Sequence, residues 1–191
     1  RHLHNIDPFL AERIEVIRGA QGVLYGSDAL GGIVNVLSAK PHFVEDGQFY
    51  YEGELLSEYH TNNQEWMNGI KVKAAEGKIG INLGLSMRSA ENYKTPNHPT
   101  WNPGDLKGTL PRFSGELPFT NFENRSANLA LGYKEDWGTI VLENTYWHSY
   151  QNYLGHTPGN TTPPFEAISS AGQELSNNET QLRAEVVAGE W

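Results

Sequence analysis

Apolar and polar residues alternate along most of the chain from about residue 48 onward. In the clearest run, residues 79–88 (I-G-I-N-L-G-L-S-M-R), every odd position is apolar and every even position is glycine or polar. Successive side chains of a strand point to opposite faces, so this run predicts a strand with one apolar and one polar face. The run is as long as the roughly 9–11 residues that cross a bilayer as a tilted strand.

The same alternation predicts five further strands, which makes about six in all. They fall within residues 49–58, 70–73, 126–133, 137–150 and 181–186. In the run 140–142 (I-V-L) neighbouring positions are all apolar, so the outward face of that strand stays open. Aromatic residues near the expected strand ends suit the interfacial girdles of a membrane barrel: they are Phe49, Tyr51, Trp137, Tyr146, Trp147 and Tyr150.

The links between these strands differ in length. Residues 75–78 and 135–138 read as tight hairpins, whereas residues 92–123 and 151–177 are long and rich in Pro, Gly, Asn and Thr; residues 60–64 are intermediate. Alternating short and long links are typical of an outer-membrane barrel, with short periplasmic turns and long external loops. A soluble β-rich module that binds a ligand or glycan remains the alternative, because alternation also marks half-buried strands of soluble sheets.

The first 40 residues follow a different pattern. Asp7 and Pro8 suit a helix start, as a cap and a first-turn proline. Residues 14–18 and 33–37 predict two short strands, and five glycines punctuate the stretch between them. The expected unit, strand–turn–helical turn–turn–strand, is too small to bury a core unaided, so it must pack against something larger.

Composition removes several classes of function. The net charge of −9 disfavours nucleic acid, and the absence of Cys closes off disulfides, thiol catalysis and Cys-type zinc sites. No window approaches the roughly 18 apolar residues of a membrane helix. No phosphate loop, nucleophile elbow or H-E-x-x-H helix is present, so we expect no catalytic residue, metal site or cofactor. The chain begins at Arg1, which suggests an internal piece or a processed start.

Residues 12–19 (ERIEVIRG) and 24–36 (LYGSDALGGIVNV) resemble the plug signature of TonB-dependent outer-membrane receptors, E-R-I-E-V-I-R-G-P followed by L-Y-G-x-x-A-x-G-G-V-I-N-I-I. The chain departs from it at Ala20, where Pro is usual, and at Gly22, where Ser is common. The resemblance implies that residues 1–40 are the C-terminal half of a small α+β plug domain. Residues 41–191 would then be the first strands of an antiparallel transmembrane β-barrel of 22 strands.

The resemblance also implies a function. Such a receptor lies in the bacterial outer membrane, contacts its lipid, and takes up a scarce ligand into the periplasm. Ferric siderophores come first among the expected ligands, followed by haem, cobalamin or a glycan. The energy would come from the TonB–ExbB–ExbD complex through an N-terminal TonB box that this sequence does not contain. No further cofactor is implied.

Particular residues receive roles from this reading. Arg13 and Arg18 are expected to lock the plug through forked hydrogen bonds to carboxylates of the barrel lumen. Candidates are Glu52, Glu54 and Glu58 on the first strand, and carboxylates of barrel strands beyond this sequence are the alternative. An architectural role is expected for Gly19, Tyr25, Gly26, Gly31, Gly32 and Asn35, with Asn35 bridging backbone groups. Contact with the ligand is expected from the loop residues Tyr93, His98, Trp101 and Arg112, through stacking and cation–π interactions.

Overall fold

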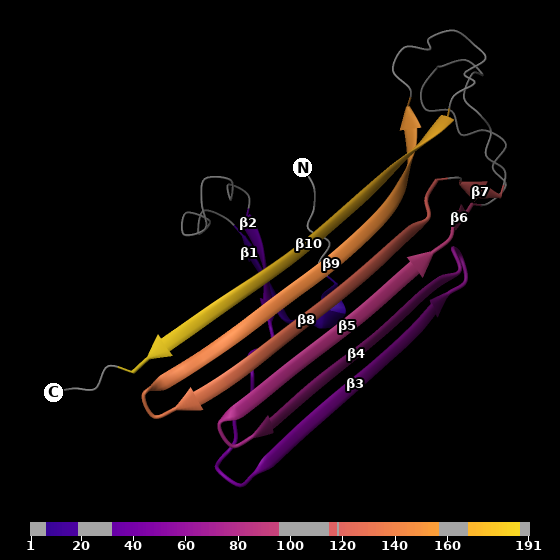
Figure 1. Cartoon of the computed structure of the whole chain (residues 1–191). Coiled ribbons are helices and arrows are strands. Elements are labelled where there is room, and N and C mark those ends of the chain that lie inside the picture. Colours follow the sequence, from indigo (N-terminus) through magenta and orange to yellow (C-terminus); the bar gives the residue numbers. More distant parts are fainter. Residues whose placement is uncertain (1–6, 19–31, 96–114, 118, 157–167, 188–191) are drawn as a thin grey trace.

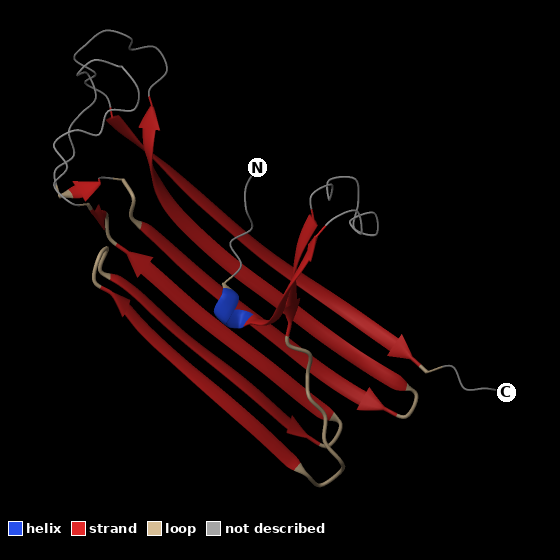
Figure 2. Ribbon diagram, turned by 180° about the vertical axis from the view of Figure 1, so that it is seen from behind, coloured by secondary structure: helices blue, strands red, loops and turns tan. Residues whose placement is uncertain are grey.

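The computed structural model describes residues 7–18, 32–95, 115–117, 119–156 and 168–187, and only the backbone for residues 154–156 and 168–171. In these residues a six-stranded antiparallel sheet carries a small two-stranded unit on one of its faces (Figures 1 and 2). We call the six-stranded sheet the wall. The smaller unit is the hairpin unit, and residues 39–48 between the two are the linker. The predicted mainly β, antiparallel fold is confirmed.

The wall has the strand order β10-β9-β8-β5-β4-β3, so every strand pairs with its neighbour along the chain. In the long link between β5 and β8, the short strands β6 (Tyr93–Lys94) and β7 (Glu116–Leu117) pair with each other. The wall strands are β3 (Phe49–His60), β4 (Glu65–Glu76), β5 (Ile79–Ala90), β8 (Phe122–Glu135), β9 (Gly138–His156) and β10 (Ile168–Val186).

The two tight hairpins are confirmed, whereas one long link is shorter than predicted. Gly77 and Lys78 join β4 to β5, and the φ angle of +50° at Gly77 favours glycine. The predicted link over residues 151–177 was too long, because β9 runs to His156 and β10 begins at Ile168. Residues 151–156 pair with residues 168–173 in the sheet, although many of them are polar, because the hydrogen bonds between strands come from the backbone.

The wall has two distinct faces, as the alternation predicted. On β5 the odd-numbered side chains are open, with Ile79 60% and Leu85 43% exposed, whereas Asn82 and Ser86 on the other face are buried. No second sheet covers the apolar face in the part of the chain that the structure describes. The register also resolves the ambiguous run: Ile140 pairs with Tyr133 and Leu142 with Leu131, so both belong to the apolar face.

Aromatic pairs stand at both ends of β3 on the apolar face. The rings of Phe49 and Tyr51 are 6.0 Å apart, and those of Tyr59 and Trp66 are 4.7 Å apart. Such belts suit the two interfaces of a membrane. The expectation that Tyr146, Trp147 and Tyr150 lie near a strand end was wrong, because β9 continues past them. Among the described residues, no helix has the length and apolar character needed to cross a membrane.

The hairpin unit consists of a 3-10 turn, η1 (Pro8–Leu10), and the antiparallel strands β1 (Ala11–Arg18) and β2 (Gly32–Ser38). The predicted helix start is confirmed as a single turn: the Asp7 carboxylate accepts a 2.9 Å hydrogen bond from the Phe9 N–H. β1 begins at Ala11, three residues earlier than predicted, because the chain becomes extended directly after η1. Gly32 has a φ of +134°, and a Cβ there would lie 2.6 Å from the Ile17 carbonyl oxygen.

Candidate functional site

The hairpin unit and linker meet the polar face of the wall over a floor of glycines. Gly80 on β5 and Gly132 on β8 are directly paired. A Cβ at Gly80 would lie 2.1 Å from the His42 carbonyl oxygen, and one at Gly132 would lie 2.7 Å from side-chain carbons of Pro41 and Phe43. These distances are far shorter than a normal contact, so the linker can cross the wall here only because both positions lack a side chain.

The 3-10 turn rests on the same face by a second close approach. A Cβ at Gly69 would lie 2.4 Å from the Phe9 ring, and one at Gly84 would lie 2.9 Å from Leu10 Cδ2. The ammonium group of Lys71 lies 4.5 Å from the centroid of the Phe9 ring, within the range of a cation–π interaction. The 3-10 turn is thus held on the wall by close packing over Gly69 and Gly84 and by the cation–π interaction of Lys71.

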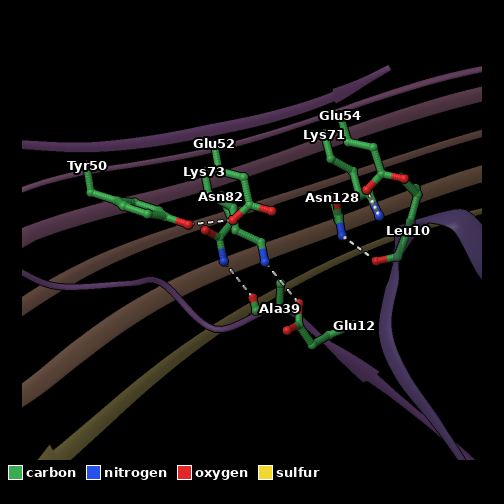
Figure 3. A network of polar contacts seen from close by, with 10 residues as sticks. All are labelled: Leu10, Glu12, Ala39, Tyr50, Glu52, Glu54, Lys71, Lys73, Asn82 and Asn128. Atoms are coloured by element: carbon green, nitrogen blue, oxygen red, sulfur yellow. Dashed lines mark hydrogen bonds and ion pairs between the residues drawn. The ribbon is translucent and has the colours of Figure 1, made fainter. Parts of the chain in front are cut away.

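Two wall asparagines hold main-chain carbonyl groups of the segments that lie over them (Figure 3). Asn82 Nδ2 donates a 3.0 Å hydrogen bond to the Ala39 carbonyl, and Asn128 Nδ2 donates a 3.4 Å bond to the Leu10 carbonyl. Neither carbonyl lies within a strand of the hairpin unit, so these side chains supply partners that the ladder does not. Asn82 and Asn128 therefore act as docking points for the backbone.

Charged side chains form the third component of this interface (Figure 3). Lys73 on β4 forms a 3.3 Å ion pair with Glu12 of the hairpin unit. Two positions away, Lys71 forms a 2.7 Å ion pair with Glu54 of β3. The hydroxyl of Tyr50 donates to the Glu52 carboxylate. In the described residues, the ion pair between the hairpin unit and the wall joins a carboxylate on the former to a lysine on the latter.

This polarity is the reverse of the predicted arginine lock. Arg13 forms a 2.7 Å ion pair with Glu15 inside the hairpin unit, and Arg18 is exposed at the end of β1. The predicted lumen carboxylates do lie on the polar face, but their contacts are with the wall itself: Glu52 with Tyr50, Glu54 with Lys71 and Glu58 with His60. The locking role of Arg13 and Arg18 stays a prediction.

Sequence reasoning missed the lysines of β4 as contacts of the hairpin unit. The signal was present, because Lys71 and Lys73 alternate with Ile70 and Val72 and so had to share the polar face with the carboxylates. What the pattern could not give was the third group, Glu12, which is distant in sequence. The contacts of Arg88 at the start of β4 were also missed. Arg88 forms a 3.1 Å ion pair with the half-buried Glu65 and donates a 2.9 Å hydrogen bond to Met67 Sδ.

The remaining predicted residues divide into two groups. Asn35 donates a 3.3 Å hydrogen bond to the Glu15 side chain directly across the hairpin, rather than to backbone groups. Tyr93 lies exposed in β6, and its backbone N–H donates to Thr120 Oγ1. Seven predicted residues lie outside the described residues: Gly19, Tyr25, Gly26, Gly31, His98, Trp101 and Arg112.

A crevice separates the hairpin unit from strands β8 and β9. Its lining includes Asp7 and Leu10 from the first turn, Val36 from β2, and Ser126 and Thr145 from the wall. The hairpin unit is packed on β4 and β5 and also accepts a hydrogen bond from Asn128 on β8; the crevice lies beside these contacts, between β2 and the strands β8 and β9.

Comparison with known proteins places this arrangement in a family. The family model described as TonB-dependent Receptor Plug Domain matches residues 1–33. The Vitamin B12 transporter BtuB of Vibrio cholerae serotype O1 (strain ATCC 39541) is 30% identical over 145 residues, which is 73% of this chain and 20% of that protein. The chain belongs to the TonB-dependent receptors. Its location is therefore the outer membrane.

Two further relatives are similar to parts of this TonB-dependent receptor chain. The Vitamin B12 transporter BtuB of Photobacterium profundum is 61% identical over 92 residues, 46% of this chain and 14% of that protein. The Ferrioxamine receptor of Yersinia enterocolitica is 43% identical over 44 residues, 23% of this chain and 6% of that protein. The chain thus spans a fifth or less of the length of these curated relatives. No solved structure gives a significant match.

Proposed function

We propose that the receptor containing this chain takes up a scarce small-molecule ligand across the outer membrane, using energy from the TonB–ExbB–ExbD complex. The observation that carries the proposal is the seated hairpin unit on the polar face of a sheet whose opposite face is apolar and open. A plug inside a lipid-embedded barrel requires this pairing of faces. In this reading residues 1–40 are part of the plug and residues 41–191 are barrel strands.

For the ligand we propose a cobalamin-type compound first. The matches to relatives named vitamin B12 transporters extend over 145 and 92 residues, which is longer than the 40-residue plug segment, so both include residues beyond that segment. A ferric siderophore is the second candidate, favoured by the 44-residue match to a relative named a ferrioxamine receptor. Both are metal chelates with extended polar surfaces, which suits aromatic and charged loop residues such as Tyr93, Trp101 and Arg112.

The test is uptake by cells that carry the intact receptor. Labelled cyanocobalamin and a labelled ferric hydroxamate are supplied in turn, with TonB present and with TonB deleted. We expect accumulation of one ligand that depends on TonB, together with binding that does not. Binding without TonB-dependent accumulation would contradict active transport. Retention of a ligand by the protein in membrane-free extract would favour the soluble binding module instead.

The arginine lock is carried forward as part of this proposal. Arg18→Ala in the intact receptor is expected to lower uptake while leaving the affinity for the ligand almost unchanged, because the arginine would hold the plug rather than the ligand. Arg13→Ala is expected to lower uptake less than Arg18→Ala, since Arg13 already pairs with Glu15 inside the hairpin unit. An equal loss of ligand affinity in Arg18→Ala would assign that residue to the ligand site.

A further inference from the structure

Two equivalent lysine–glutamate pairs cross from β3 to β4 on the polar face, and they are in different states. Glu54 is directly opposite Lys71, and Glu52 is directly opposite Lys73. The first pair is closed at 2.7 Å. The second is open: Lys73 reaches 3.3 Å to Glu12 of the hairpin unit, and Glu52 accepts a hydrogen bond from Tyr50 instead. Figure 3 shows both arrangements side by side.

The side chains of Lys73 and Glu52 are close enough to form an ion pair with each other. Directly opposed residues of an antiparallel sheet have Cβ atoms about 4.5–5.5 Å apart, a distance that a lysine and a glutamate side chain easily span. The closed pair shows that this sheet accommodates such a contact two positions away, between the same two strands. Lys73 therefore has two carboxylates available, one on the hairpin unit and one on the wall.

We propose that Glu52 is a reserve partner for Lys73: when the hairpin unit leaves its seat, the lysine transfers from Glu12 to Glu52. The inference rests on the proposed function, because uptake requires the plug to move. With the hairpin unit seated, the side chain of Lys73 is 27% exposed; lifting of the unit removes its ion pair with Glu12, and that loss opposes release. Closure onto Glu52 removes that cost, and the Tyr50 hydroxyl holds the Glu52 carboxylate beside the lysine until then.

Glu54 provides a matched control on the same strand. It carries the same charge, faces the same way and is opposite a lysine of the same partner strand. Lys71 already forms an ion pair with Glu54, and it contacts the hairpin unit through the Phe9 ring rather than through a carboxylate. Exchange of partners is therefore specific to Lys73, and neutralising Glu54 should not reproduce the effect of neutralising Glu52.

The experiment measures how readily the hairpin unit lifts from the wall in the purified intact receptor, without ligand or TonB. Ser126→Cys places a thiol on β8, in the crevice beneath the hairpin unit. The 191 residues contain no other cysteine, and any cysteine elsewhere in the receptor is replaced. The rate at which a maleimide labels Cys in this position, in mild urea, reports lifting of the unit.

The exchange predicts a distinctive set of rates. Glu12→Gln should label faster, because the seated state exchanges the Glu12 ion pair, which Lys73 prefers there, for the Glu52 pair that the lifted state already has. Glu52→Gln should label more slowly, by about two- to fivefold, because the lifted state loses its ion pair. In the Glu12→Gln background, Glu52→Gln should have no further effect, since Lys73 then rests on Glu52 in both states. Glu54→Gln should label at the reference rate.

Three results would overturn the exchange: Glu52→Gln labelling at or above the reference rate, Glu54→Gln slowing the reaction as much as Glu52→Gln, or additive effects of Glu12→Gln and Glu52→Gln. The glutamine variants keep an acceptor for Tyr50 and the shape of the side chain, so all are expected to fold. Because the assay uses neither energy nor ligand, its failure is separate from a failure of TonB-dependent uptake in cells.

Discussion

At the scale of single residues, the absence of a side chain decides where the linker crosses the wall. Gly80 and Gly132 face each other on neighbouring strands, and the linker backbone passes where their Cβ atoms would stand. A glycine is usually a weak element of a strand because it loses entropy and packs nothing. Here that weakness is offset by docking, which explains why two glycines occupy paired positions near the ends of the neighbouring strands β5 and β8.

Gly80→Ala should therefore destabilise the receptor. The added methyl group would lie 2.1 Å from the His42 carbonyl oxygen, and overpacking of this kind costs about 1–3 kcal/mol. The measurement is the urea midpoint for exposure of the plug in detergent. Gly53→Ala on β3 is the control, because its nearest neighbour atom is 3.8 Å away and the change in chain entropy is the same. Equal midpoints for the two variants would contradict the close contact between the linker and Gly80.

The sequence predicted faces at this scale but not partners. Alternation was enough to place Glu52, Glu54 and Glu58 on the polar face, and Asp7 with Pro8 was enough to place a helical turn. The predicted contact between Arg13 and these carboxylates is not seen, because Glu15 lies two residues away on the same strand and competes for the guanidinium. Such competition depends on side-chain reach across a three-dimensional interface, which periodicity does not encode.

At the scale of strands, the predictions from alternation held where one face is apolar and failed where both are polar. The ten residues of β5 read from sequence lie inside the observed strand. Residues 151–156 of β9 and 168–177 of β10 were read as loop because the stretch 151–177 is rich in Pro, Gly, Asn and Thr. Beyond the apolar band no lipid or core selects for alternation, and backbone pairing alone extends the ribbon.

A charge at the middle of β5 on its apolar face should be costly. Leu83→Arg is expected to destabilise the folded receptor by about 2–4 kcal/mol, because arginine near the bilayer midplane loses its hydration. Ser57→Arg, beside the Tyr59–Trp66 pair at the end of β3, should cost about 0–1 kcal/mol, since it lies near the interface. Reversible unfolding from lipid vesicles in guanidinium measures both. Equal costs would mean that this face does not contact lipid.

The two tight hairpins should be coupled through a pH-sensitive pair. Lys78 in the β4–β5 turn lies 2.6 Å from Glu135 at the end of β8, and this hydrogen bond raises the pKa of Lys78 above its usual 10.5. A raised pKa means that the pair stabilises the fold below the unfolded-state pKa and that this contribution is lost as the pH rises through the folded-state value.

The measurement compares unfolding midpoints of the reference receptor and Lys78→Met over about pH 8 to 12. The difference between them should be constant at the lower end and shrink towards the upper end. Lys40→Met, which removes an exposed lysine of the linker, is the control and should show no such convergence. A difference between reference and Lys78→Met that stays the same across the range would exclude the pair as a source of stability.

At the scale of the whole molecule, the six-stranded sheet is open at both edges and on one face within the described residues. The edge strands of the wall are β3 and β10, and each has a row of backbone groups facing away from its partner. The apolar face adds exposed side chains along the full height of the wall, including Leu55 at 80%, Leu182 at 69% and Val186 at 71%. In a closed barrel, neighbouring strands and lipid cover all of these groups.

The 191-residue chain on its own should therefore fail to remain a monomer in plain buffer. Unpaired edges recruit other strands, and exposed apolar patches of this extent drive association, so we expect aggregates that detergent converts to smaller, β-rich species. Size-exclusion chromatography with light scattering, run with and without detergent, measures this directly. A monodisperse β-rich monomer without detergent would mean that the apolar face is covered by the chain itself, and both the lipid contact and the transport function built on it would fall.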